Sequence, residues 1–277
     1  GTLNGFRKMN HFAVINILQN TFVFLISVFL VLFLKMGVKG AVIGFVVPTV
    51  VIGVFSPLFI RKSFSLPSRI VLGNVLREIT WFGFYIVLGN SIGLINTQID
   101  SLLIGRFMSE IDVGYYATAI IIMQSITLLP SAVQVVTTPS IATYYGKKEY
   151  SKIRELVKYT MLKIFVIEIL LIILLTIFGK YILIIFFSKE FTPAYIPMLV
   201  LSVGYVIYSP LVSVGGMFTS TGKVNLSFKL NGFCAVLNTI LNLLLIPKFG
   251  LIGAAGATST SLIFTVLINV YFMKRYI

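Results

Sequence analysis

The chain has 277 residues, of which 58% are hydrophobic and 11% are charged, and its formal net charge is +14 at pH 7. Soluble domains carry about 25% charged residues, so this composition excludes a water-soluble protein. It also argues against a nucleic-acid partner, because the cations lie between hydrophobic runs and form no groove-sized basic patch with interleaved aromatic residues.

Long hydrophobic runs recur along the whole sequence. A run of roughly 20 apolar residues crosses about 30 Å of hydrocarbon as a helix. We therefore predict an all-α, polytopic membrane protein with about eight transmembrane helices. In chain order they cover residues 11–34, 40–60, 79–104, 113–138, 161–187, 193–218, 225–246 and 250–273.

The basic residues predict how these helices are oriented. When connections are assigned alternately to the two sides of the membrane, 16 of the 22 Lys and Arg residues fall on one side. Lys and Arg collect in cytoplasmic loops, so we expect this side to be cytoplasmic. With an even number of helices, both termini of the chain then lie in the cytoplasm, and the protein is expected in a bacterial cytoplasmic membrane.

The connection at residues 61–77 carries four cations and is interpreted as a linker between two lobes. Residues 1–72 then hold two helices of a first lobe, and residues 73–277 hold the six helices of a second lobe. The chain starts with Gly1 rather than Met, so we interpret it as a piece of a longer protein.

A repeated motif supports two related lobes. Lys35 precedes the sequence Gly37-x-x-Gly40-Ala41, and Lys248 precedes Gly250-x-x-Gly253-Ala254, at a separation of 213 residues. Each copy follows one hydrophobic run and precedes another. Two-lobed membrane bundles are typical of transporters that alternate between inward-open and outward-open states.

Residues 146–163 combine six cations with an apolar face at helical spacing. The face contains Tyr150, Ile153, Val157 and Met161. We expect a helix that lies on anionic lipid and continues into the fifth predicted span, with a solvated charged loop as the alternative.

Polar residues inside hydrophobic runs are the most informative feature of the sequence. At helical spacing they form stripes on five predicted spans, and these stripes cannot all point at lipid. They predict either a shared water-accessible cavity or hydrogen bonds that hold helices together. The stripes contain Asn16, Asn20 and Ser27; Asn90, Gly93, Thr97, Asp100 and Ser101; Gln124, Thr127, Ser131, Gln134 and Thr138; Asn231, Asn238 and Asn242; Thr258, Ser261, Thr265 and Asn269.

Two acidic residues, Asp100 and Glu168, lie within predicted spans. A charged residue at the centre of a membrane helix costs about 2.5–3.5 kcal/mol on insertion scales, so such residues are often functional. Asp100 either has a function or pairs with Arg106 at the outer interface, whereas a functional role is favoured for the deeper Glu168. The candidate substrate-binding residues are Arg77, Asn90, Asp100, Gln124, Glu168 and Asn238.

No pattern typical of an enzyme is present. The sequence contains one histidine, which excludes most catalytic triads and histidine-based metal sites. The segment from Gly216 to Lys223 differs from a phosphate-binding loop in its spacing, and Val224 replaces the required Ser or Thr. We expect no catalytic residue, metal or cofactor.

Several motifs resemble the polysaccharide (O-antigen, Wzx-type) flippases of the MOP transporter superfamily. The resemblance covers nearly the whole chain, and its strongest stretch is the sequence LNLLLIPKFGLIGAA at residues 241–255. Further similar stretches are Asp100 with Leu103-Ile104-Gly105, Val113-Gly114-Tyr115-Tyr116, the sequence FFSKEFTPA at 186–194, and Thr221-Gly222-Lys223.

This resemblance implies a two-lobed bundle of 12 to 14 spans, of which about four helices before Gly1 are not in the chain. It implies export of an undecaprenyl-pyrophosphate-linked oligosaccharide for polysaccharide biosynthesis, with membrane lipids and other polysaccharide-assembly proteins as partners. A multidrug or lipid II exporter of the same superfamily is the alternative within transport. A membrane-embedded glycan polymerase or ligase is disfavoured, because every predicted outer connection is short.

Overall fold

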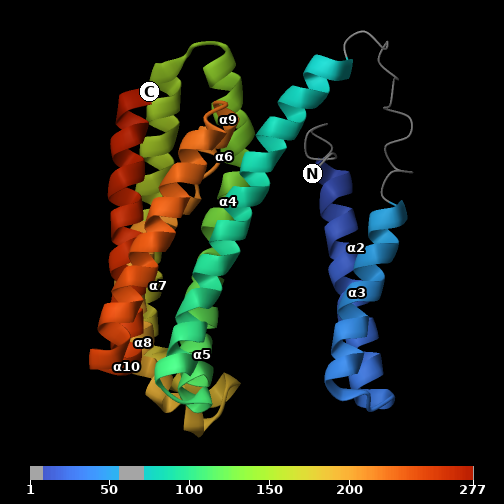
Figure 1. The fold of residues 1–277 in the computed structure, drawn as a ribbon, viewed down its shortest axis with the longest axis vertical. Helices are drawn as coiled ribbons and strands as arrows, with labels where there is room; N and C mark the ends of the chain where they lie inside the picture. Colours follow the sequence, from blue (N-terminus) through green and yellow to red (C-terminus); the bar gives the residue numbers. More distant parts are fainter. Residues whose placement is uncertain (1–8, 56–71, 277) are drawn as a thin grey trace. The chain divides into compact units, whose positions relative to one another are not determined.

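The computed structural model describes residues 9–55 and 72–276, and every regular element in these two ranges is a helix (Figure 1). The predicted all-α membrane architecture is therefore confirmed. The elements are α2 (Met9–Val28), η1 (Phe29–Phe33), α3 (Gly37–Phe55), α4 (Leu72–Phe107), α5 (Glu110–Ile126), α6 (Leu128–Gly146), α7 (Tyr150–Phe186), η4 (Lys189–Ala194), α8 (Tyr195–Val212), α9 (Met217–Ser220) and α10 (Val224–Tyr276).

The chain divides into two compact units, Gly1–Asn74 and Val75–Ile277. In the first unit, α2 packs against α3, and the close approach occurs where Gly44 leaves no room for a side chain beside Ser27. The second unit contains most of α4 and all the later helices. Its helices hold the cavities described below. The assignment of these units to two lobes of one transporter stays a prediction.

The number of spans agrees with the sequence only in part. Three helical stretches in the described residues are long and apolar enough to cross a membrane, namely Tyr150–Phe186, Lys189–Ser220 and Val224–Tyr276. A fourth span results if α5 and α6, which meet at an angle of 41°, are counted together. The predicted spans 225–246 and 250–273 are two parts of the 53-residue α10, which is non-helical at Gly250.

The break between α5 and α6 divides the predicted span 113–138. A Ser109–Asp112 capping box, in which each side chain bonds the other residue's backbone N–H, starts α5 three residues earlier than predicted. The helix ends at Ile126, and Pro130 lies in the first turn of α6, where its missing N–H costs no helical hydrogen bond. The polar residues on either side of this break therefore point in different directions.

The first glycine of each copy of the repeated motif has a positive φ. Gly37 has a φ of 54° and Gly250 has a φ of 56°, both in the left-handed region that favours glycine. The second glycine of each copy lies against the preceding helix, since a Cβ on Gly253 would collide with the Leu245 carbonyl oxygen. A Cβ on Gly40 would likewise approach the Leu30 backbone within 3.1 Å.

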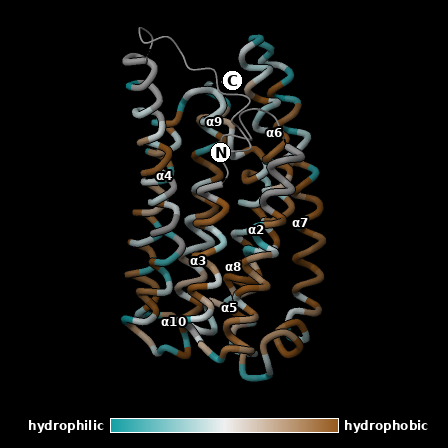
Figure 2. Tube along the Cα trace, turned by 90° about the vertical axis from the view of Figure 1, so that its right-hand side faces the viewer, coloured by the Kyte–Doolittle hydropathy of each residue, from teal (hydrophilic) through white to brown (hydrophobic). Residues whose placement is uncertain are grey.

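In the second unit, α8 is the central helix and packs against α10, α7 and α5. Its closest approach is at Gly204, where a Cβ would lie 2.5 Å from the Ser259 Cα of α10. The Ser259 hydroxyl donates to the Val200 carbonyl at 2.7 Å. Most of α7, in contrast, is hydrophobic (Figure 2) and exposed in this unit, as expected for a lipid-facing helix.

The start of α7 corrects one expectation. Residues 150–163 continue into the span as predicted, but part of their apolar face packs inside the protein instead of lying flat on a lipid surface. Ile153 is fully buried, and the half-buried Val157 and Met161 pack with it against a core cluster that includes Met217 and Met273. The rest of this face lines a groove between α7, α9 and the end of α10.

Candidate functional site

A polar cavity of about 580 Å³ lies within the second unit, between α4, α5, α8 and α10. Asp100 is the one charged residue among those that line it. The others are small, amide, hydroxyl, phenol or aliphatic side chains. The lining residues are Gly89, Ile92, Gly93, Asn96, Asp100, Ile120, Gln124, Tyr205, Tyr208, Asn231, Cys234, Asn238, Thr258, Ser261, Leu262 and Thr265.

Asp100 accepts hydrogen bonds from three other positions in the chain. The Tyr116 hydroxyl donates to its Oδ2 at 2.9 Å, and the Thr258 hydroxyl donates to the same oxygen at 2.6 Å. The Asn242 amide donates to Oδ1 at 2.6 Å. Hydrogen bonds to a carboxylate are shorter and stronger than bonds between neutral groups, and here they connect α4 to α5 and to both halves of α10.

Asn238 extends this network along α10. Its amide donates to the Thr258 hydroxyl at 3.3 Å, and its carbonyl oxygen accepts from the Asn242 amide at 3.1 Å. Asn238 and Asn242 are one helical turn apart and both are almost completely buried. The network therefore joins the two sides of the kink at Gly250 as well as forming one wall of the cavity.

Two buried amide oxygens near the cavity have no hydrogen-bond partner among the described residues. They are Oδ1 of Asn96 on α4 and Oδ1 of Asn242 on α10. Buried polar atoms are nearly always paired with protein or water, so an unpaired acceptor beside a cavity is available to a ligand hydroxyl. Asn96 itself lines the cavity.

Three of the six predicted site residues come together here. Asp100, Gln124 and Asn238 all line the cavity, from α4, α5 and α10 respectively. Gln124 is exposed, whereas the other two are buried. Asn90 lies on α4, but its side chain is outside the described residues.

Arg77 and Glu168 lie elsewhere. Arg77 is exposed near the start of α4, about 23 residues or roughly 35 Å along the helix from Asp100. Glu168 lies on α7, is fully buried, and accepts a hydrogen bond from Ser209 of α8 at 2.9 Å. Its Oε2 has no partner in the described part of the chain. Neither residue lines the polar cavity.

The alternative pairing of Asp100 with Arg106 does not occur. An ion pair joins Lys152 and Glu149 at 3.1 Å, and neither Asp100 nor Arg106 takes part in one with a described residue. Asp100 instead uses the three neutral donors, because its side chain faces α5 and α10 rather than the end of α4.

Several tyrosines of the site were not predicted from sequence. Tyr116 is only 1% exposed and bonds Asp100 and Thr258. Tyr205 and Tyr208 of α8 line the cavity. Their spacing of three residues places them on one helical face, which is the signal that could have identified them.

Comparison with known families agrees with this fold. The pattern of the MatE family matches residues 86–244, and that of the polysaccharide biosynthesis protein family matches residues 1–145. The chain belongs to the polysaccharide biosynthesis protein family, which confirms the family predicted from the sequence.

Similar curated proteins come from archaea and bacteria. The probable low-salt glycan biosynthesis flippase Agl15 of Haloferax volcanii is 25% identical over 201 residues, which are 73% of this chain and 43% of the relative. The capsular polysaccharide biosynthesis protein CapF of Staphylococcus aureus is 26% identical over 202 residues, which are 72% of this chain and 50% of the relative. The chain thus spans about half the length of these relatives.

Solved MATE structures share the fold. A MATE transporter in the straight conformation superposes with a TM-score of 0.77 at 18% identity, covering 99% of this chain and 64% of the other. An outward-facing multidrug resistance MATE transporter of the MOP superfamily gives 0.75 at 17% identity, covering 95% and 61%. At these identities the likeness shows the fold alone.

Proposed function

We propose that the protein flips lipid-linked oligosaccharides, carried on undecaprenyl pyrophosphate, across the cytoplasmic membrane for polysaccharide biosynthesis. Alternating access between two lobes moves the sugar chain while the lipid tail stays in the bilayer. Two similar proteins support this proposal: Agl15 is a probable glycan biosynthesis flippase, and CapF is a capsular polysaccharide biosynthesis protein. Both termini of the chain are placed in the cytoplasm, and other polysaccharide-assembly proteins are the proposed partners.

The observation that carries the proposal is the chemistry of the polar cavity. A sugar chain cannot cross hydrocarbon unaided, because each polar group without a partner costs several kcal/mol, in the range of about 2–7. The cavity offers amides, hydroxyls and phenols that donate and accept hydrogen bonds as sugar hydroxyls do. It therefore suits a neutral, hydroxyl-rich ligand.

We further propose that the pyrophosphate binds outside this cavity. Phosphate groups are usually bound by Arg, Lys or helix N-termini, and no Lys or Arg is among the lining residues. Arg77 is our candidate for the pyrophosphate, since it is exposed and lies near one end of the helix that forms the cavity wall. Gln124, Asn238 and Asn90 are assigned to the sugar. Asp100 holds Asn242 and Thr258, which in turn bond Asn238.

Transport of a labelled lipid-linked oligosaccharide into proteoliposomes of the full-length protein tests the proposal. Replacing Gln124 and Asn238 by Ala is expected to slow flipping of the glycan. Asn225→Ala is the matched control, because Asn225 is exposed at the start of α10 and is not among the cavity lining. Equal transport rates for the unaltered protein, the variants of Gln124 and Asn238 and the Asn225→Ala control would contradict a sugar-binding role for the cavity.

A multidrug exporter is the second candidate, and Glu168 is the observation that favours it. Exporters of cationic compounds couple transport to ions through a buried carboxylate, and Glu168 is buried with one oxygen unpaired. If Glu168→Gln abolishes the efflux of cationic dyes from cells, this second candidate is supported. If neither the unaltered protein nor the Glu168→Gln variant exports dye, the multidrug candidate is excluded and the glycan proposal remains.

A further inference from the structure

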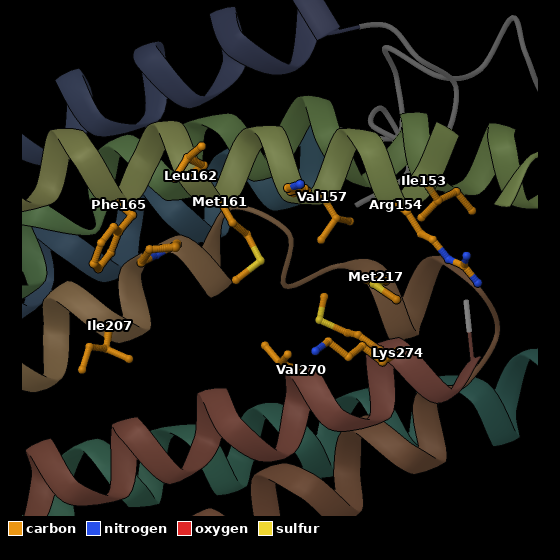
Figure 3. Close-up of a pocket in the computed structure, with 13 residues that line it drawn as sticks. Ile153, Arg154, Val157, Met161, Leu162, Phe165, Ile207, Met217, Val270 and Lys274 are labelled. Atoms are coloured by element: carbon orange, nitrogen blue, oxygen red, sulfur yellow. The ribbon is translucent and has the colours of Figure 1, made fainter. Parts of the chain in front are cut away.

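A second cavity of the same unit is unlike the polar one. It has a volume of about 740 Å³ and lies between α7, α8, α9 and the end of α10 (Figure 3). Ten of its thirteen lining residues are apolar or proline, and the other three are cations. The lining residues are Ile153, Arg154, Val157, Lys158, Met161, Leu162, Phe165, Ile207, Pro210, Met217, Val270, Met273 and Lys274.

Two of the cations of this groove lie at one of its ends, and the opposite end is apolar. Arg154 and Lys158 lie in the first turns of α7, and Lys274 lies in the last turn of α10. Figure 3 shows Arg154 and Lys274 at the end where Met217 lies, with Phe165 and Ile207 at the opposite end. The groove is therefore amphipathic along its length.

No Asp or Glu is among the lining residues. Lys158 and Lys274 are both exposed, and neither forms an ion pair with a described residue. Basic pockets between membrane helices bind anionic lipid headgroups, and each Lys or Arg near an anionic membrane surface contributes about 1 kcal/mol of attraction.

We propose that this groove is a binding site for one anionic phospholipid of the membrane. The phosphate lies between Lys158 and Lys274, near Arg154, and an acyl chain lies along Val157, Met161 and Ile207. The lipid comes from the leaflet at the end of the unit where α7 begins and α10 ends. It bridges these two helices, which flank the central α8. This inference does not depend on the transported substrate.

Native mass spectrometry of the full-length protein in detergent, titrated with dioleoyl phosphatidylglycerol, tests the site. The double variant Lys158→Gln/Lys274→Gln is expected to bind this lipid roughly thirtyfold more weakly. The double variant Lys147→Gln/Lys148→Gln is the matched control, since it removes the same charge from two exposed positions outside the groove. The control is expected to bind like the unaltered protein.

Two further measurements distinguish a bound phospholipid from a bound free phosphate. Met161→Trp fills the apolar part without changing the charge and is expected to weaken binding as well. Inorganic phosphate at millimolar concentration is expected to leave the bound lipid in place. Binding of phosphatidylcholine as tight as that of phosphatidylglycerol, displacement of the lipid by phosphate, or undiminished binding by the Lys158/Lys274 variant would each overturn the proposal.

Discussion

The Asn242 amide donates a hydrogen bond to the Asp100 carboxylate at 2.6 Å, across 142 residues of chain. This contact joins α4, the first helix of the second unit, to the half of α10 that precedes its kink. Thr258, in the half that follows the kink, donates to the same carboxylate. Asp100 is thus the common acceptor for three segments that meet at one end of the polar cavity.

Substitution of Asp100 by Ala is expected to destabilise the unit. It removes the acceptor of three buried donors, and an unsatisfied buried donor costs about 1–3 kcal/mol. The loss is measured as a lower midpoint of thermal unfolding for the full-length protein in detergent. Asp112→Ala is the control, since Asp112 bonds only in the exposed cap of α5. Equal midpoints for the two variants would show that the Asp100 network contributes little.

Removal of single cavity amides is expected to reduce glycan flipping without loss of fold. Each hydrogen bond to the ligand contributes about 0.5–1.5 kcal/mol, so Gln124→Ala should lower the transport rate by about two- to tenfold. The effect should appear in the rate at low substrate concentration. A matched reduction in Asn225→Ala, which lies outside the cavity, would instead indicate a general loss of active protein.

Arg77→Ala is expected to weaken export of the pyrophosphate-linked glycan more than Arg77→Lys does, because a lysine retains the charge that meets a phosphate. Export is measured as surface polysaccharide in cells that depend on the protein, at matched expression. Unchanged export by the Ala variant would remove Arg77 from the proposed site. The structure supports such a comparison because Arg77 is exposed rather than buried in the fold.

Gly250→Ala is expected to destabilise the protein by about 1–2 kcal/mol, because its φ of 56° is costly for any residue with a Cβ. Gly256→Ala is the matched control. Gly256 is helical, lies six residues further along α10 and has open space around the position of a Cβ. Alanine there should be neutral or stabilising by up to about 1 kcal/mol. The midpoint of unfolding should therefore be lower for Gly250→Ala than for Gly256→Ala.

Cys234 gives a direct test of water in the polar cavity. It is the single cysteine of the chain, lines the cavity and is 5% exposed. A small, charged, thiol-reactive reagent that cannot cross the membrane is expected to modify Cys234 slowly, and bound glycan should protect it. The Cys234→Ser variant measures any modification by the reagent that does not occur at Cys234. Modification by apolar reagents alone would show that the cavity is closed to water.

The polar part of the site was predictable because polar residues stand out in an apolar sequence. Asp100 and Asn238 were identified in this way, and both belong to the network. The direction of each stripe was not predictable, because it depends on packing between helices. Thr127, Ser131, Gln134 and Thr138 were expected to continue the stripe of Gln124, yet none of them lines the cavity. The break at Ile126 separates them from α5.

Tyr116 shows a second limit of sequence analysis. An amphipathic ring near a helix end is typical of a membrane interface, and the same residue type is equally suited to a buried hydrogen bond. Tyr116 forms a buried hydrogen bond instead of lying at the interface because α4 and α10 pack next to it. Glu168 is a similar case, since α7 is hydrophobic on nearly every side and its sequence does not indicate which face meets α8.

The absence of cations from the described lining of the polar cavity has a consequence for the range of cargo. Amides and hydroxyls interact with sugar hydroxyls in general and do not require a particular charged substituent. We therefore expect the size of the saccharide, more than the identity of its residues, to decide what this half of the protein accepts. Glycans of different composition but similar bulk would then share one carrier.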